Sequence, residues 1–147
     1  MVEMLVSLKI PDATALSALQ ALHEMGYKQL KSLERSIYYQ FQISGDEKKF
    51  RESIAKADIL VNSNKHTASF EISKDPKRVF ILVEDIEQGT VLLRNLKDRL
   101  GFSVIKSTNT GTLWAFTIDS KEKKELAKKM VEDLLSNIHY QKYSVVK

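Results

Sequence analysis

The chain of 147 residues contains no cysteine, two prolines, five glycines and three histidines. The lack of cysteine excludes disulfides, thiolate nucleophiles and cysteine metal sites, and fits a reducing compartment. With so few glycines the closest candidate for a phosphate loop is Thr110-Gly111-Thr112, which a hairpin turn explains better. His23, His66 and His139 stand singly, and no pair has the i, i+4 spacing of a helical metal site. Metal binding, nucleotide binding and nucleophilic hydrolysis therefore have no anchor in this sequence.

Long apolar runs are also missing, since no segment approaches the roughly 20 residues that span a bilayer. The first residues, Met1-Val2-Glu3-Met4, are acidic where a secretory signal is basic. The net charge of +4 is modest, and lysines alternate with acids, as in residues 121–125, which is typical of a solvated helix face. We therefore expect a cytoplasmic globular protein with neither a membrane nor a nucleic acid as partner.

An internal repeat appears when the sequence is compared with itself at an offset of 75 positions. Each copy opens with the two-residue alternation of a strand, at residues 2–10 and 79–83. Leucines at helical spacing follow, and each helix is expected to end at a glycine before an aromatic residue, Gly26-Tyr27 and Gly101-Phe102. Both copies thus begin with a strand and a helix.

Two strands joined by a tight turn are expected next in each copy. They span residues 30–34 and 37–43 in the first copy, and residues 104–108 and 112–118 in the second. Asn109-Thr110-Gly111 is good hairpin chemistry for the second turn.

The rest of each copy predicts one more helix and a closing strand. Ser44-Gly45-Asp46-Glu47 is a capping box, and Asp119-Ser120-Lys121-Glu122 is its counterpart at the same offset. An apolar stripe at helical spacing follows each box. The closing strands are expected around residues 68–72 and 143–145.

Each copy therefore predicts the order βαββαβ, a ferredoxin-like α+β unit with helices on one face of an antiparallel sheet. We place the first repeat at 1–73 and the second at 77–147, joined by a linker too short to let them drift apart. Strand alternation turns several apolar side chains away from the helices, and an apolar open face favours a partner. The predicted inter-repeat or dimer interface consists of Leu5, Phe80, Leu82, Leu113 and Ala115, with Tyr38 beside them.

An RNA-recognition motif has the same element order, but its signature is absent. The run from Arg35 to Phe41 lacks the glycine of that signature. Tyr39 and Phe41 alternate in phase with the core, which leaves only Tyr38 on the open face.

Three segments resemble the PurS family, the small subunit of phosphoribosylformylglycinamidine (FGAM) synthase in purine biosynthesis. Residues 21–27, Ala-Leu-His-Glu-Met-Gly-Tyr, follow the family's helix ending and are the most specific segment. Val6-Ser7-Leu8-Lys9 is similar to its first strand, and residues 59–62 and 134–137 resemble its Leu-Leu-Ala-Asn. The resemblance is strongest in the first copy and implies two fused PurS-like units. The family's Asp-Pro-x-Gly loop and its later proline are missing.

The resemblance implies a non-catalytic subunit that assembles an ATP-dependent synthetase with a glutaminase. The complex would use ATP, magnesium and glutamine, none of them bound by this chain, and self-association is possible. Exposed contacts to partners are predicted near helix ends and hairpins, at Tyr27, Tyr38, His66 and Asn109.

Two alternatives come from other classes of protein. Paired ferredoxin-like repeats of the ACT type bind amino acids between the copies, usually with a glycine-rich turn after the first strand, and Gly89 is the only glycine near such a turn. An RNA-binding pair of repeats is the weaker alternative, and steeply salt-dependent binding would favour it.

Overall fold

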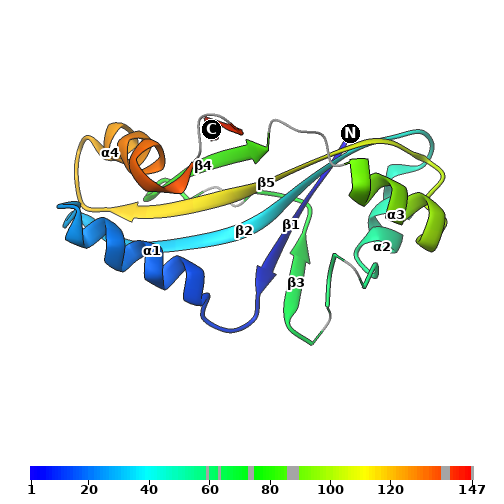
Figure 1. Cartoon of the computed structure of the whole chain (residues 1–147), viewed down its shortest axis with the longest axis horizontal. Coiled ribbons are helices and arrows are strands. Elements are labelled where there is room, and N and C mark those ends of the chain that lie inside the picture. The colour runs from blue at the N-terminus through cyan, green and yellow to red at the C-terminus, as the bar shows by residue number, and fades with distance from the viewer. Residues whose placement is uncertain (59, 63, 73–74, 86–89, 137–139, 147) are drawn as a thin grey trace.

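The structure is a computed structural model that describes residues 1–58, 60–62, 64–72, 75–85, 90–136 and 140–146 (Figure 1). In chain order its elements are β1 (Val2–Leu8), α1 (Ala13–Glu24), β2 (Leu30–Ile43), α2 (Glu47–Ile54), β3 (His66–Ser69), β4 (Arg78–Asp85), α3 (Thr90–Leu100), β5 (Ile105–Ile118), α4 (Lys123–Met130), the π-helix η1 (Val131–Leu135) and β6 (Gln141–Val146). The strands form one antiparallel sheet in the order β3-β1-β2-β5-β4-β6. The predicted α+β class with an antiparallel sheet is confirmed.

The predicted hairpins are wrong, because β2 and β5 are each one continuous strand. They pair with each other from Leu30, opposite Ile118, to Ile43, opposite Ile105. Asn109, Thr110 and Gly111 consequently lie inside β5 and form no turn. Pairing between the two halves supplies strand partners for backbone groups that a tight turn would otherwise leave to solvent.

The pairing of β2 with β5 has an approximate two-fold centre. Ile37 lies opposite Thr112, which is 75 positions later in the chain, so equivalent positions of the two halves meet there. The flanking strands correspond at a slightly different offset. Val2 pairs with Phe41 and Val79 pairs with Phe116, so β1 and β4 match at 77 positions.

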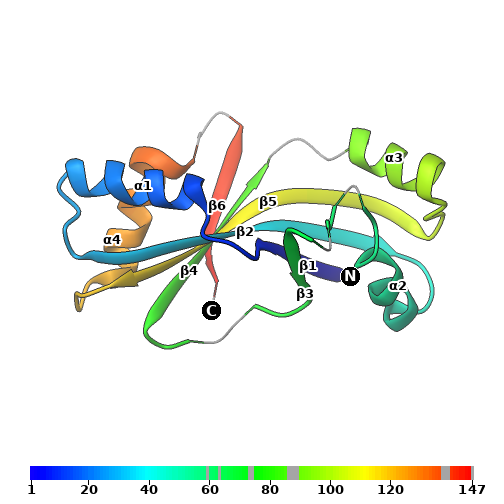
Figure 2. The same ribbon diagram turned by 90° about the horizontal axis from the view of Figure 1, so that it is seen from below.

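The helices cover one face of the sheet in two groups at opposite ends, α1 with α4 and α2 with α3 (Figures 1 and 2). Each group packs on a core drawn from both halves. Leu22 of α1 shares a buried cluster with Phe116 and Met130, and Ile54 of α2 shares another with Leu96 of α3 and Ile105. The first helix of each half therefore packs beside the second helix of the other half. The boundaries 1–73 and 77–147 stay a prediction, and residues 73 and 74 lie outside the described residues.

The helix ends follow the sequence closely. Gly26 and Gly101 have φ angles of 104° and 73°, the left-handed conformation predicted for the residues that close α1 and α3. Asp46 caps α2 by accepting the backbone N–H groups of Lys48 and Lys49. The second predicted box is weaker, since Ser120 accepts only the N–H of Glu122, just before α4 begins.

Candidate functional site

The sheet face opposite the helices carries a third apolar cluster. Tyr38 and the side chains predicted to form an interface all belong to it, and each is less than 9% exposed: Leu5, Tyr38, Phe80, Leu82, Leu113 and Ala115. The partly buried Ile72 and Val146 pack against them. The structure thus brings the predicted interface residues together within one chain, and contact with a second copy stays a prediction.

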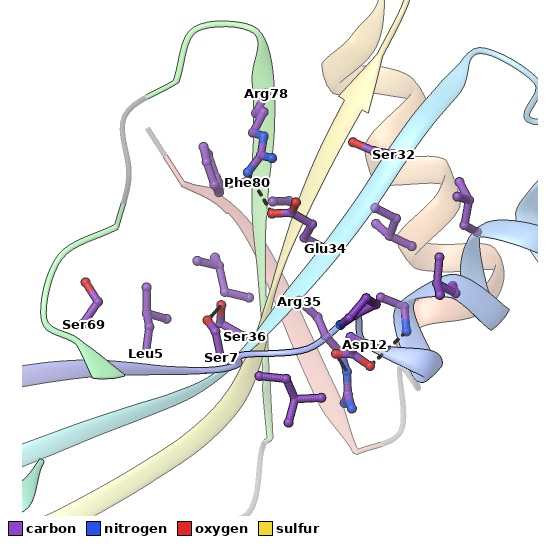
Figure 3. Close-up of a pocket in the computed structure, with 18 of the residues that line it drawn as sticks. Leu5, Ser7, Asp12, Ser32, Glu34, Arg35, Ser36, Ser69, Arg78 and Phe80 are labelled. Carbon is purple, nitrogen blue, oxygen red and sulfur yellow. Dashed lines mark hydrogen bonds and ion pairs between the residues drawn. The ribbon is translucent and has the colours of Figure 1, made fainter. Parts of the chain in front are cut away.

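A cleft of about 660 Å³ opens beside this cluster (Figure 3). We call it the β1–β2 cleft. It lies between the end of β1, the start of α1, the first part of β2 and the start of β4. Apolar residues make up much of its lining, including Leu5, Leu33, Phe80, Leu113 and Ala115, and the polar residues are Ser7, Asp12, Ser32, Glu34, Arg35, Ser36, Ser69, Glu71 and Arg78.

The cleft lies where the sheet lacks a neighbouring strand. The pairing of β1 with β2 ends at Val6 opposite Ile37, because β1 stops at Leu8 and Pro11-Asp12 lead the chain into α1. The part of β2 from Ser32 to Ser36 is therefore paired with β5 alone. One edge of this strand faces the cleft.

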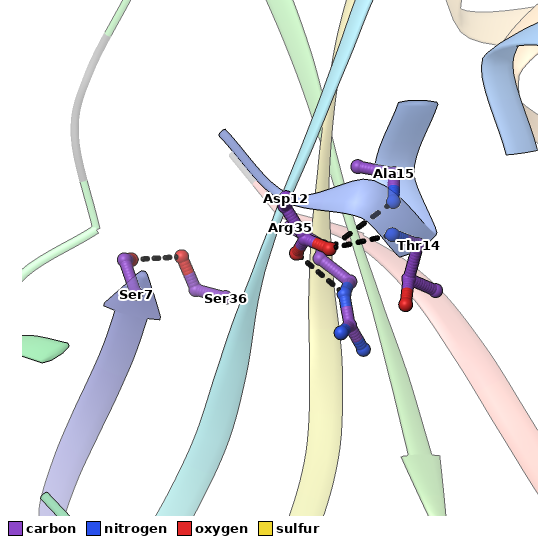
Figure 4. A network of polar contacts seen from close by, with 6 residues as sticks. All are labelled: Ser7, Asp12, Thr14, Ala15, Arg35 and Ser36. Carbon is purple, nitrogen blue, oxygen red and sulfur yellow. Dashed lines mark hydrogen bonds and ion pairs between the residues drawn. The ribbon is translucent and has the colours of Figure 1, made fainter. Parts of the chain in front are cut away.

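Asp12 and Arg35 form the main polar contact at the mouth of the cleft (Figure 4). One Asp12 carboxylate oxygen accepts the backbone N–H groups of Thr14 and Ala15 and so caps α1. The other oxygen accepts Nε of Arg35 at 2.6 Å. The Ser7 and Ser36 hydroxyls are 2.7 Å apart. Asp12 thereby fixes both the start of α1 and the direction of the Arg35 side chain.

The far side of the cleft is also polar, whereas the side near α1 is apolar and open. Arg78 donates from Nη1 to a Glu34 carboxylate oxygen at 3.0 Å. Leu8, Ile10 and Leu16 are 36%, 71% and 51% exposed. The cleft therefore combines an apolar floor, paired charges and an exposed apolar rim.

The place on the open face that is related to the cleft by the approximate two-fold is filled by Tyr38, which lies 75 positions before Leu113. Its hydroxyl donates to Glu3 at 2.6 Å and accepts from Gln40. Gln40 in turn accepts from Asn109 at 3.1 Å. Burial raises the pKa of Tyr38 above its ordinary value, and the hydrogen bond to Glu3 adds to the shift. The two symmetry-related places on the open face thus differ, with an open cleft at one and a tyrosine at the other.

Each of the four residues predicted to contact a partner forms a hydrogen bond within the chain. Tyr38 is buried, which corrects its prediction as an exposed contact, because it belongs to the apolar cluster that β1, β4 and β5 form with it on the open face. Asn109 is joined to it through Gln40 and lies in no turn. Tyr27 donates to Asp133, and this hydrogen bond raises the pKa of Tyr27 to about 12. The ring of His66 accepts the backbone N–H of Asn62. Tyr27, His66 and Asn109 stay predictions as partner contacts.

The described residues offer neither a metal site nor a membrane-spanning helix. Within the described ranges, no group of three or more His, Asp and Glu side chains is placed to hold a metal ion. His23 contacts the Leu30 carbonyl oxygen through Nε2 at 2.7 Å, near the end of α1 as predicted, and His139 lies outside the described residues. None of the described helices is both long enough and apolar enough to cross a membrane.

Sequence reasoning missed Asp12 and Arg35 as a pair. Arg35 stands between Leu33 and Ile37 in the alternation of β2, at a position where the pattern calls for an apolar residue. A charged residue at a position expected to be apolar could have identified Arg35. The position of Asp12, just before the first residue of α1, could have identified its partner.

Part of the chain matches a known protein family. Residues 85–147 match PurS, described as phosphoribosylformylglycinamidine (FGAM) synthase, and no curated protein matches the chain. The match starts at the last residue of β4 and covers α3, β5, α4 and β6, although the resemblance read from the sequence was strongest in the first half. It supports involvement in FGAM synthase and purine biosynthesis, and it supports the tandem duplication without confirming it. Residues 85–147 are therefore similar to the PurS family.

Proposed function

We propose that the chain is a cytoplasmic, non-catalytic assembly subunit of FGAM synthase. It bridges the ATP-dependent synthetase and the glutaminase, and ATP, magnesium and glutamine bind to those subunits. The observation that carries the proposal is the PurS match over residues 85–147.

The architecture supports a bridging role. Both halves share one sheet and two mixed cores, so the ends of the molecule are held in a fixed relation. The open face also differs at its two symmetry-related places, with the β1–β2 cleft at one and Tyr38 at the other. A rigid chain with two different faces suits contacts with two different subunits.

The test is co-purification and reconstitution. The tagged chain is recovered from its own cytoplasm at low salt with glutamine and a magnesium nucleotide present, and its companions are identified by mass spectrometry. We expect a synthetase subunit and a glutaminase. Mixed with both, the chain should raise glutamine-dependent FGAM formation and leave ammonia-dependent formation by the synthetase unchanged, because its role is to bring the glutaminase into place. Recovery of neither subunit would reject the proposal.

An ACT-like module that binds a small regulatory molecule is the second candidate. The observation that favours it is the cleft, because its lining comes from both halves, as with Arg35 and Arg78. Native mass spectrometry of the freshly purified chain tests this candidate. Retention of an amino acid or a purine, without recovery of the synthetase or glutaminase, would favour it over the assembly subunit.

A further inference from the structure

We propose that the β1–β2 cleft binds an extended segment of a partner polypeptide, which carries a large apolar side chain next to an acidic residue. The identity of the partner rests on the proposed function, and the nature of the segment rests on the cleft itself.

The backbone of β2 calls for an extended segment. Lys9 donates its backbone N–H to the Lys65 carbonyl on the β3 side. Backbone N–H and C=O groups point alternately to the two sides of a strand, so those of Val6 point toward β2 and meet those of Ile37. By the same alternation along β2, the backbone groups of Leu33 and Arg35 point to the side that β1 leaves open. A peptide in line with β1 would pair with this edge, which is how strand addition gains affinity from main-chain hydrogen bonds.

The place occupied by Tyr38, which is related to the cleft by the approximate two-fold, indicates which side chain the cleft accepts. At the offset of 75 positions, Tyr38 corresponds to Leu113. Glu3, which accepts the hydrogen bond of the Tyr38 hydroxyl, corresponds to Phe80 at the offset of 77 positions. Gln40, which donates to that hydroxyl, corresponds to Ala115 at the offset of 75 positions. The open cleft thus has a smaller side chain where the ring of Tyr38 lies, and apolar groups where its hydroxyl is bound. It therefore suits a large side chain without a polar tip, such as Phe or Leu.

The positive charge of Arg35 at the mouth of the cleft favours an acidic residue beside the apolar residue of the bound segment. Asp12 engages Nε of Arg35, and in the described part of the chain the two Nη groups have no further hydrogen bond or ion pair. A guanidinium held in this way presents a fixed pair of donors to a carboxylate. The exposed Leu8, Ile10 and Leu16 extend the apolar surface along the same side. An acidic residue beside an apolar one in the partner would meet both features.

The first test fills the cleft from within. Leu113→Tyr places at this site the side chain that Tyr38 provides at the symmetry-related place, and Leu134→Tyr makes the same exchange at an exposed position of η1. We expect Leu113→Tyr to weaken binding of the partner subunit about tenfold or more, as loss of a central anchor does, and Leu134→Tyr to leave binding unchanged. Circular dichroism and thermal unfolding identify a variant that fails to fold, and in that case Arg35→Gln, with weaker and less salt-sensitive binding expected, replaces it.

The second test maps the contact directly. Because the chain has no cysteine, Ser36→Cys gives a single site for a photoactivated thiol crosslinker, and Ser53→Cys on α2 is the exposed control. We expect Ser36→Cys to label one segment of one partner subunit, with an apolar and an acidic residue adjacent, and Ser53→Cys not to label that segment.

The outcomes separate the two proposals. Recovery of both subunits with equal binding by wild type and Leu113→Tyr would overturn the inference and leave the assembly role standing. Recovery of neither subunit would overturn the assembly role. The inference would also be overturned if label from Ser36→Cys stayed within the chain, or if wild type retained a small molecule that Leu113→Tyr loses.

Discussion

Asp12 shows how a single side chain serves two structural purposes. One of its carboxylate oxygens caps α1 and the other holds Arg35 at 2.6 Å, and the two side chains are only 15% and 25% exposed. A cap of this kind stabilises a protein by about 1 kcal/mol, and a partly buried ion pair adds a geometry-dependent amount. The start of α1 and the mouth of the cleft therefore depend on the same carboxylate.

Variants at this position separate the two contributions. Asp12→Ala removes both contacts and should lower the free energy of unfolding by about 1–2 kcal/mol. Asp12→Ser keeps a capping oxygen and loses the ion pair, so its stability should lie between those of Asp12→Ala and wild type, close to that of Arg35→Ala. Urea unfolding followed by circular dichroism measures all three. Equal loss in Asp12→Ser and Asp12→Ala would show that the cap contributes nothing.

Tyr38 should make the protein sensitive to alkaline pH. Burial, with Glu3 beside the hydroxyl, raises the pKa of Tyr38 above the value of about 10 expected in the unfolded chain. The neutral phenol is thus favoured in the folded state, so its stabilising effect is complete below about pH 10 and is lost as the pH rises through the folded pKa. Tyr27, with its pKa raised to about 12, acts in the same direction.

The measurement is the free energy of unfolding of wild type and Tyr38→Phe from neutral pH to above pH 10. We expect the wild-type value to fall more steeply above pH 10. At neutral pH the variant should be less stable by about 1 kcal/mol, because Glu3 and Gln40 lose a hydrogen-bond partner. If the free energies of unfolding of wild type and Tyr38→Phe changed in parallel with pH, Tyr38 would have the same pKa in the folded and the unfolded state.

At the scale of elements, Gly111 sets how closely β4 and β5 approach. A Cβ atom at this position would lie 2.5 Å from the carbonyl oxygen of Val83 and 3.0 Å from Cα of Glu84, both of them main-chain atoms. Glycine is therefore required for close packing, while the backbone of this strand is ordinary. Its counterpart in the other half, 75 positions earlier, is Ser36, on the side where the cleft is open.

Gly111→Ala should therefore shift β4 and lower the free energy of unfolding by about 1–3 kcal/mol, the usual cost of overpacking. Ser107→Ala, on the same strand, is the control and should change it by less than about 0.5 kcal/mol. Chemical denaturation of both variants measures the effect. A Gly111→Ala variant as stable as wild type would show that the pair Glu84 and Gly111 separates without cost.

The long strands mark the limit of what local sequence predicts. Asn109-Thr110-Gly111 is permissive for a hairpin, and alternation on both sides of it agrees with a turn or with one continuous strand. Whether a turn or a continuous strand forms depends on pairing with residues 30–43, which lie about 75 positions earlier in the chain. No local sequence pattern predicts a pairing over that distance. Helix ends were predictable because Gly26 and Gly101 act through their own φ angles.

The candidate site was predictable on its apolar side only. Leu5, Leu113 and Phe80 follow from strand alternation, which also places Tyr38 on the same face. The contact between Asp12 and Arg35 joins a helix cap to a strand residue 23 positions later, and the open edge exists because β1 ends at Leu8. Both depend on tertiary geometry.

At the scale of the whole molecule, the exchange of helices makes the halves interdependent. In the first half, Leu22 of α1 packs with Phe116 and Met130, and Ile54 of α2 packs with Leu96 and Ile105, all four partners belonging to the second half. Such an exchange follows when a hairpin opens into one long strand, the geometry of a domain swap within a single chain. Each apolar cluster would lose much of its packing if the halves were separated.

The fragment of residues 1–73, produced alone, should therefore fail to form a stable monomer. It should either remain unfolded or form a dimer in which two copies of β2 pair with Ile37 opposite Ile37, the arrangement that Ile37 and Thr112 have in the intact chain. Light scattering after gel filtration gives the mass, circular dichroism gives the folded content, and mixing with residues 77–147 should restore a one-to-one complex, because each cluster then regains both contributors. A compact monomer with cooperative unfolding would contradict this expectation, since it would show that each half closes its own hairpin and that the continuous strands are not needed for folding.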